Sequence, residues 1–295
     1  MLDRYTFVEN EYPFHPVSGA IASTRGRNPD GSPKVHNNTN EEMVDVLEET
    51  CKGIDLDKRF YDAFRRLDRA IFVDWDNVPE EHRENVGGSP YNFLACVFGN
   101  GQTVPAANLL LTSLVLMDFQ PGQRFLEIGA GSGYYASLAA NVAGEGSHIY
   151  STEIIPEFVD RARTAVERSK LSDRVTVLQA DPGVLGSPEN GPYDRIVTTV
   201  ACSKERQLLD LIDQLAVNGT LSNTIVGLSD GEAIEPWMPG MELTPDRMVM
   251  SDPSKGFAYV VSYKFTKRDE DIVEFGLKNN MDIEKGTGAG PYFRT

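Results

Sequence analysis

A regular alternation of short β-rich runs with helical segments, starting near Gln123, constrains the fold of this 295-residue chain more than any other feature. Runs rich in β-branched and aromatic residues predict strands at 124–128, 148–151, 175–179 and 195–200. Apolar residues at helical spacing predict helices at 134–142, 157–170 and 204–215. The alternation predicts an α/β fold with a doubly wound parallel sheet, which binds ligands at the carboxyl ends of its strands.

The end of the chain differs from this alternating part. Residues 219–226 and 257–263 are further β-rich runs. The second run, with an extension over 265–267, suits an antiparallel pair that closes the sheet. The tail from Asp269 is polar, and its end at Gly286-Thr-Gly-Ala-Gly290 is expected to be mobile.

The beginning of the chain predicts an arm followed by two helices. Residues 1–38 have balanced charge, and their second half is rich in Gly, Pro, Ser and Asn, which is typical of a segment without its own core. Thr39 and Glu42 have capping-box spacing, so a helix over 40–52 is predicted. Apolar residues on one face predict a second helix over 56–67.

Composition excludes several classes of function. The chain has 44 acidic and 28 basic residues, and the net charge of −16 opposes binding to nucleic-acid phosphates. Its three cysteines and four histidines are widely spaced, so neither a disulfide framework nor a metal site is predicted. The longest apolar stretch, 109–117, is too short for a membrane helix, and the charged N-terminus does not suit a signal peptide. We expect a cytoplasmic protein without nucleic-acid or membrane partners, and its oligomeric state stays open.

Three glycines, Gly129, Gly131 and Gly133, stand where the first predicted strand of the alternation turns into a helix. Glycine adopts backbone conformations closed to other residues and lets a ligand approach the chain. A dinucleotide fingerprint would need glycine where Tyr134 stands, and the lysine of a phosphate-binding loop is absent. A tight turn without a ligand is the alternative.

The sequence Glu127-Ile-Gly-Ala-Gly-Ser-Gly133 closely resembles the cofactor loop of class I S-adenosylmethionine-dependent methyltransferases. The resemblance implies a Rossmann-like fold and S-adenosyl-L-methionine as cofactor. It also implies that the methionine part of the cofactor lies along Glu127, Gly129, Ala130, Gly131 and Gly133.

Two acidic residues are in register with that loop. Glu153 ends the next predicted strand, where a carboxylate accepts the ribose hydroxyls of an adenosine. An exposed acid without a ligand is the alternative. Asp181 ends the third strand, where the resemblance implies a contact with the adenine amino group. Asp181-Pro182-Gly183 is also a good turn sequence, so a turn without a ligand contact is the alternative there.

Residues upstream of the glycine loop resemble one particular family within this class. Residues 60–73, then Tyr91, then Phe98-Gly-Asn-Gly-Gln-Thr103 are similar to the protein-L-isoaspartate O-methyltransferase family, which opens with a helix, a strand entry ending in Phe-Val and a Gly-x-Gly-Gln-Thr loop. The similarity covers about 40–227 and implies methyl esterification of a carboxylate on a small molecule, peptide or protein. We expect four segments: an N-terminal arm (1–38), a helical N-terminal extension on the acceptor side (39–120), a cofactor-binding domain (121–268) and a C-terminal tail (269–295).

The scarcity of catalytic side chains suits a carboxylate acceptor. A carboxylate with a pKa of about 4 is ionised at pH 7, so alignment and desolvation suffice for its attack on a methyl group. Enzymes that methylate amino groups commonly carry an Asn/Asp-Pro-Pro-Tyr-like turn where this chain has Ala201-Cys202-Ser203. The acceptor atom is therefore expected to be oxygen.

The acceptor side departs from the family pattern. The family follows Gly-Gln-Thr with an apolar residue and a serine beside the acceptor carboxylate, whereas Pro105 follows Val104 here and offers neither hydroxyl nor N–H. Thr103 is therefore the catalytic candidate. We expect an enzyme, a carboxylate O-methyltransferase with an altered acceptor that is a small carboxylic acid or a particular peptide. Repair of isoaspartyl proteins and a catalytically inactive, cofactor-binding regulator are the alternatives.

An anionic acceptor on an acidic chain predicts a local patch that is cationic or lined with N–H groups. Guanidinium groups would offset the long-range repulsion between the chain and the acceptor carboxylate. The candidates are Arg25, Arg27, Arg65, Arg66 and Arg69.

Overall fold

The described residues of the computed structural model are 5–7, 37–85, 88–92, 95–99, 102–202, 205–227, 259–267 and 273–277. The chain divides into two compact units. One, the strand-rich unit, comprises Met1–Phe14, Arg124–Gly129 and Ala180–Thr295. The other, the helix-rich unit, comprises His15–Gln123 and Ala130–Gln179.

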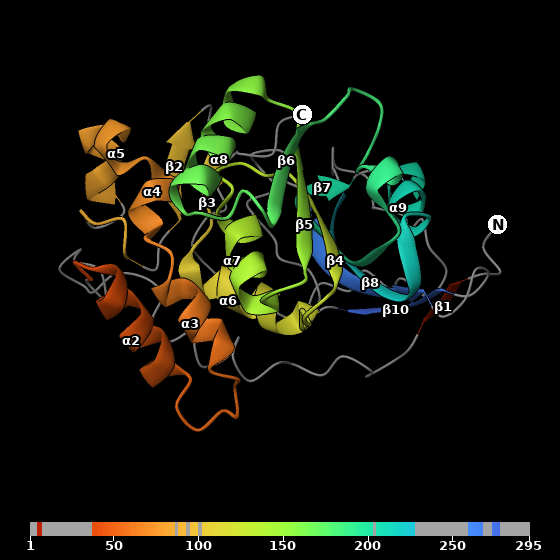
Figure 1. Ribbon diagram of the computed structural model, residues 1–295, viewed down its shortest axis with the longest axis horizontal. Helices are drawn as coiled ribbons and strands as arrows, with labels where there is room; N and C mark the ends of the chain where they lie inside the picture. The colour runs from red at the N-terminus through yellow and green to blue at the C-terminus, as the bar shows by residue number, and fades with distance from the viewer. Residues whose placement is uncertain are drawn as a thin grey trace. The chain divides into compact units, whose positions relative to one another are not determined.

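The strand-rich unit is built on strands in the order β1-β10-β9-β8-β7-β4, of which Figure 1 labels all but β9. Their bounds are β1 (Tyr5–Phe7), β4 (Arg124–Ile128), β7 (Tyr193–Cys202), β8 (Leu215–Gly227), β9 (Tyr259–Lys267) and β10 (Val273–Leu277). The neighbours β4, β7 and β8 are parallel, whereas β9 is antiparallel to both β8 and β10. Helix α9 (Glu205–Ile212) joins β7 to β8 and packs on both, and a short 3-10 helix, η3 (Pro188–Asn190), precedes β7.

The helix-rich unit combines two strand pairs with several helices. The pair β5 (His148–Glu153) and β6 (Val175–Gln179) is parallel, and the pair β2 (Cys96–Gly99) and β3 (Gln102–Val104) is antiparallel. The helices are α2 (Asn40–Thr50), α3 (Arg59–Arg65), α4 (Arg69–Val73), η2 (Trp75–Asn77), α5 (Glu80–Asn85), α6 (Ala107–Met117), α7 (Tyr134–Ala143) and α8 (Pro156–Arg168). Helix α8 packs on β5 and β6, and α7 packs on β5 and α3 (Figure 1).

The first helix shows how local sequence produces these elements. Thr39 Oγ1 accepts the N–H of Glu42 at 3.1 Å, and the Glu42 carboxylate accepts the N–H of Asn38 at 2.6 Å, so the predicted capping box starts α2. Met43, Val44 and Leu47 form the buried face of the helix.

Most predicted elements are confirmed within a few residues, but two expectations are wrong. The runs 257–263 and 265–267 form the single strand β9, which pairs antiparallel with β8 and with β10 of the polar tail. The end expected to be mobile, 286–290, lies outside the described residues. The Phe-Val strand entry is helix α4, because the Asp68 carboxylate accepts the N–H of Ala70 at 3.0 Å and caps a helical turn. The predicted boundaries of the four segments stay a prediction.

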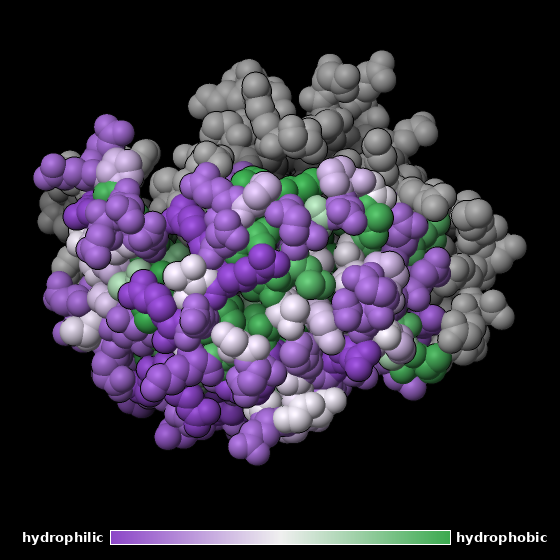
Figure 2. Space-filling model, turned by 45° about the horizontal axis from the view of Figure 1, so that its top comes forward, coloured by the Kyte–Doolittle hydropathy of each residue, from purple (hydrophilic) through white to green (hydrophobic). Residues whose placement is uncertain are grey.

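The surface drawn in Figure 2 is mainly hydrophilic, with hydrophobic side chains between the polar ones. The exposed large hydrophobic residues of the described chain are Ile154, Val184, Val200 and Val217. No described helix has the length and apolar character needed to cross a bilayer.

Candidate functional site

The glycine loop adopts the backbone that its sequence predicts. Gly129, Gly131 and Gly133 have φ angles of 96°, 51° and 79°, which are unfavourable for residues with a Cβ. Between the first two, Ala130 is buried and donates its N–H to Thr152 O at 2.9 Å.

The surroundings of the three glycines differ. A Cβ on Gly129 would lie 2.5 Å from Thr199 Oγ1, so this glycine permits close packing within the strand-rich unit. A Cβ on Gly133 would lie 3.3 Å from Ala162 of α8, so Gly133 permits the close approach of two helices. A Cβ on Gly131 would meet no described atom within 4 Å. Gly131 is therefore the loop glycine that a ligand can approach.

Glu153 organises the glycine loop. Its Oε2 accepts the N–H of Gly131 at 2.9 Å, and its Oε1 accepts the N–H groups of Ile154 and Ile155 at 2.9 and 3.0 Å. The residue is 8% exposed, so the alternative of an exposed acid is wrong. A carboxylate offers about four acceptor positions. The three N–H groups leave one of them, on Oε2, for a ligand.

Ile154 adds an apolar surface next to this carboxylate. Its side chain is 58% exposed, although isoleucine is a residue type that is usually buried. The backbone here is fixed from β6, because Gln179 Nε2 donates to Ile154 O at 2.9 Å and to Glu153 O at 3.3 Å. Local sequence did not reveal this contribution of Ile154 and Gln179, since their adjacency depends on the pairing of β5 with β6.

The strand-rich unit contains the two remaining predicted cofactor residues. Glu127 is buried in β4, in register opposite Val197 of β7. Asp181 is exposed at the start of a tight turn, in which Val184 N–H donates to Asp181 O at 3.1 Å and Gly183 has a φ of 95°. The turn is therefore present, and the Asp181 carboxylate faces solvent.

Thr103, the catalytic candidate, lies on β3 opposite Val97 and is half-buried. The chain beyond it is held by Arg69, which is 0% exposed. The guanidinium of Arg69 donates from Nη2 to Pro105 O at 3.1 Å and from Nη1 to Asn92 O at 2.7 Å. The acceptor-side chain is therefore positioned through its backbone carbonyl groups.

The expectation of a cationic patch is wrong for two of the candidate arginines. Arg69 is buried, and Arg65 forms ion pairs with three acidic residues of α2, which are Glu41, Asp45 and Glu48. The Arg65 guanidinium joins α3 to α2, and the Arg69 guanidinium binds the backbone carbonyls of Asn92 and Pro105. Arg66 is exposed, whereas Arg25 and Arg27 lie outside the described residues.

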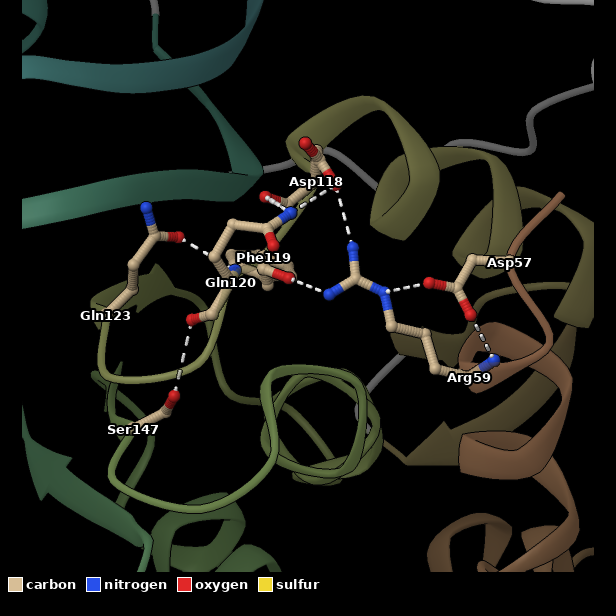
Figure 3. A network of polar contacts seen from close by, with 7 residues as sticks. All are labelled: Asp57, Arg59, Asp118, Phe119, Gln120, Gln123 and Ser147. Carbon is tan, nitrogen blue, oxygen red and sulfur yellow. Dashed lines mark hydrogen bonds and ion pairs between the residues drawn. The ribbon is translucent and has the colours of Figure 1, made fainter.

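Helix α6, which follows Pro105, is anchored at its far end by Arg59 (Figure 3). The guanidinium donates to Phe119 O at 2.5 Å and to the Asp118 carboxylate at 2.8 Å, and it also pairs with Asp57. In the next turn, the Ser147 hydroxyl donates to Gln120 O. Both ends of α6 are thus fixed by buried or half-buried arginines.

A polar cavity lies in the helix-rich unit near Tyr91. Its volume is about 400 Å³, and its lining includes Asp68, Asp74 and Trp75 but none of the residues predicted to bind the cofactor. Tyr91 Oη donates to Asp68 Oδ1 at 2.9 Å. Burial, together with this hydrogen bond, raises the pKa of Tyr91 to about 12.

Residues 38–229 match the sequence model of the family described as protein-L-isoaspartate(D-aspartate) O-methyltransferase. The chain belongs to this family. A protein-L-isoaspartate O-methyltransferase of Aeropyrum pernix is 34% identical over 61% of this chain and 64% of its own length. One of Methanopyrus kandleri is 30% identical over 77% of this chain and 92% of its own length. The chain thus spans slightly less than two thirds of some curated relatives and nearly all of another.

Solved structures confirm the class I methyltransferase, Rossmann-like fold. A Plasmodium falciparum structure described as a protein-L-isoaspartate O-methyltransferase in complex with S-adenosyl-L-homocysteine superposes with a TM-score of 0.56. The match covers 83% of this chain and 97% of the other at 20% identity. A second protein-L-isoaspartate O-methyltransferase gives a TM-score of 0.55 at 22% identity, covering 78% of this chain and 60% of the other.

Within the family fold, sequence patterns did not indicate the role of Arg69. Its hydrogen-bond acceptors lie 23 and 36 residues further along the chain. An arginine next to a helix start is usually a surface residue. Only its complete burial shows that it supports the segment containing Thr103 and Pro105.

Proposed function

We propose that this protein transfers a methyl group from S-adenosyl-L-methionine to an oxygen of a carboxylate acceptor. One arrangement carries the proposal: the buried Glu153 carboxylate holds Gly131, the loop glycine next to open space, and keeps one acceptor position for a ligand. Membership of the O-methyltransferase family supports the same reaction.

The residues present fit this cofactor. The remaining position on Glu153 Oε2 accepts one ribose hydroxyl, and the exposed Ile154 offers an apolar face to a purine ring. We assign the adenine amino group to Asp181. The methionine part is assigned to the loop residues Glu127, Gly129, Ala130, Gly131 and Gly133. When bound, the cofactor supplies an electrophilic methyl group on its sulfonium.

The acceptor is proposed to differ from a general isoaspartyl substrate. Pro105 has no hydroxyl where the family pattern has a serine, and its carbonyl oxygen is engaged by Arg69. Thr103 is the nearest hydroxyl along the chain and is proposed to orient the acceptor carboxylate. Because that carboxylate is ionised at pH 7, no side chain needs to remove a proton.

Two measurements test the reaction. Calorimetry with S-adenosylhomocysteine is expected to show binding, and a labelled-methyl assay is expected to show transfer to particular peptides or carboxylic acids with low efficiency on general isoaspartyl peptides. No binding, or tight binding of NADH, would reject the cofactor. Efficient turnover of any isoaspartyl peptide would support protein repair instead. Binding without transfer to any carboxylate would favour an inactive regulator.

Thr103→Val separates orientation of the acceptor from binding of the cofactor. The variant removes the hydroxyl and keeps the shape of the side chain. Turnover should fall by about tenfold, which corresponds to one lost hydrogen bond to a charged group, while S-adenosylhomocysteine affinity stays unchanged. Equal turnover by the variant and the wild type would show that Thr103 is structural.

A further inference from the structure

A β-bulge near the end of β7 changes which side chains this strand exposes. Residues 197–201 of β7 run alongside residues 222–224 of β8, so β7 carries extra residues at this point. Side chains normally alternate between the two faces of a strand, whereas the consecutive Thr199 and Val200 are both exposed. Bulges are frequent next to functional sites, where they redirect a side chain. The two side chains that this bulge exposes are therefore candidates for a role at the site.

The hydroxyl of Thr199 reaches the first residue of the glycine loop, within the same strand-rich unit. Its Oγ1 lies 2.7 Å from Gly129 O and 2.9 Å from Ile128 O, and the hydroxyl donates its single proton to these carbonyl oxygens. Branching at Cβ restricts the threonine side chain to few rotamers. The first carbonyl group of the loop is thus fixed by a side chain that lies 70 residues further along the chain.

The backbone of Gly129 packs directly against this side chain. Its φ is 96°, and a Cβ on it would lie 2.5 Å from Thr199 Oγ1 and 2.7 Å from Val200 Cγ1. A residue with a Cβ would require both the loop conformation and the bulge to change. Gly129 is half-buried and Thr199 is exposed, so the hydrogen-bonded pair lies at the surface of the unit. A ligand can therefore reach the atoms that the hydroxyl holds in place.

We propose that Thr199 is a positioning residue for the methionine part of the cofactor and acts through the carbonyl group of Gly129. This inference rests on the proposed function and adds a residue of β7 to it. The methionine part carries an ammonium group, which only donates hydrogen bonds, and a carbonyl oxygen has two lone pairs. The Thr199 hydroxyl occupies one lone pair of Gly129 O and fixes the direction of the other. A carbonyl that is already oriented loses less conformational freedom when the ligand binds.

Binding of two ligands distinguishes this role from a general effect on the fold. S-adenosylhomocysteine contains the amino-acid part, whereas 5′-methylthioadenosine has the same nucleoside and sulfur without it. Thr199→Val keeps the shape of the side chain and removes its hydroxyl. The variant should raise the Kd for S-adenosylhomocysteine by about tenfold and the Kd for 5′-methylthioadenosine by less than about twofold. Calorimetry measures both values without any need for a methyl acceptor.

Three further variants complete the experiment. Thr199→Ser keeps a hydroxyl at the same position and should bind both ligands as the wild type does. Thr164→Val is the matched control, since Thr164 is exposed and its hydroxyl donates to Asp160 O at 2.9 Å within α8. This control should change neither Kd. Thr199→Ala is a second variant without the hydroxyl, and it replaces Thr199→Val in the comparison if the valine variant does not fold.

The outcomes separate the inference from the proposed function. An unchanged Kd for S-adenosylhomocysteine in Thr199→Val overturns the inference. An equal rise for both ligands also overturns it, because the hydroxyl would then support the fold and not the methionine part. A Thr199→Ser variant that binds as poorly as Thr199→Val shows that the hydroxyl is not the decisive group and contradicts the inference as well. Absence of S-adenosylhomocysteine binding by the wild type contradicts the proposed function itself.

Discussion

Two regions of the helix-rich unit are held together in opposite ways. In the donor region, 130–133 with 153–155, backbone N–H groups converge on one carboxylate, Glu153. In the acceptor region, 103–108, one buried guanidinium, Arg69, binds a backbone carbonyl from outside the segment. One region thus depends on a side chain within it, and the other depends on a side chain from another helix.

The two ways of holding the backbone place different limits on the side chains of the two regions. Replacing Glu153 removes the hydrogen-bond partner of three N–H groups, so the donor region loses the contacts that hold its backbone together with the proposed ribose contact. Arg69 binds the carbonyl oxygens of Asn92 and Pro105, which any residue at those positions would provide. Side chains of the acceptor region can therefore be substituted without loss of the hydrogen bonds that hold its backbone. The arrangement favours a retained cofactor and a variable acceptor.

Among the substitutions that test this comparison, Arg69→Met should have the largest effect on stability. It leaves two backbone carbonyl oxygens without their charged donor, so the free energy of unfolding should fall by about 3–5 kcal/mol in urea titrations. Arg65→Met is the matched control, because its three ion pairs are more accessible to water and should cost only about 1 kcal/mol. Equal losses would show that Arg69 does not hold the acceptor region.

Glu153→Ala should weaken cofactor binding by about 1–3 kcal/mol, or about 5–150-fold in Kd, because the ribose loses its acceptor. Calorimetry with S-adenosylhomocysteine measures this change. Glu153→Gln keeps one carbonyl oxygen for Ile154 and Ile155, so it should retain more stability than alanine while binding the cofactor as poorly. The exposed Glu157, at the start of α8, provides a control whose replacement by alanine should change neither property.

Gly131→Ala distinguishes a ligand surface from a turn. Gly122 is its matched control, since both glycines have positive φ and neither Cβ would meet a described atom within 4 Å. Both alanine variants should lose about 1 kcal/mol of stability through backbone strain. Only Gly131→Ala should raise the Kd for S-adenosylhomocysteine, by about tenfold. Unchanged affinity in that variant would remove the loop from the cofactor site.

Tyr91 precedes Asn92, whose backbone carbonyl accepts a hydrogen bond from Arg69. Replacement of Tyr91 should give the smallest effect, and this effect depends on pH. Burial and the hydrogen bond to Asp68 raise its pKa to about 12, above about 10 in the unfolded chain. The folded state therefore holds the phenol proton more tightly, and this stabilisation is complete below about pH 10 and is lost as the pH rises towards 12. Because the side chain is partly exposed, the contribution should be on the order of 1 kcal/mol.

Urea unfolding at about pH 9 and about pH 11.5 measures that contribution. The Tyr91→Phe variant should lose less stability between the two pH values than the wild type does. If stability depends on pH identically in both proteins, ionisation of Tyr91 does not contribute to the stability of the folded chain.

Features that depend on neighbouring residues could be predicted from local sequence. The capping box at Thr39, strands β4 and β6, and the positive φ of the loop glycines all follow from spacing and from residue types with narrow conformational preferences. The position of Glu153 at the end of a strand belongs to this group, because β5 and the residue that ends it are adjacent in the chain.

Features that depend on distant packing appeared only in the folded chain. The burial of Arg69 and the open space that the described residues leave beside Gly131 depend on neighbours brought together by the fold. Strand β10 was not predicted, although Val273, Phe275 and Leu277 alternate with Glu274 and Gly276, because an alternation over five residues is a short signal. Its pairing with β9 appears only in the folded chain. Burial and hydrogen-bond pairing are properties of the packed chain. The residue type determines which donors and acceptors are present, and the tertiary structure determines which groups they bond to.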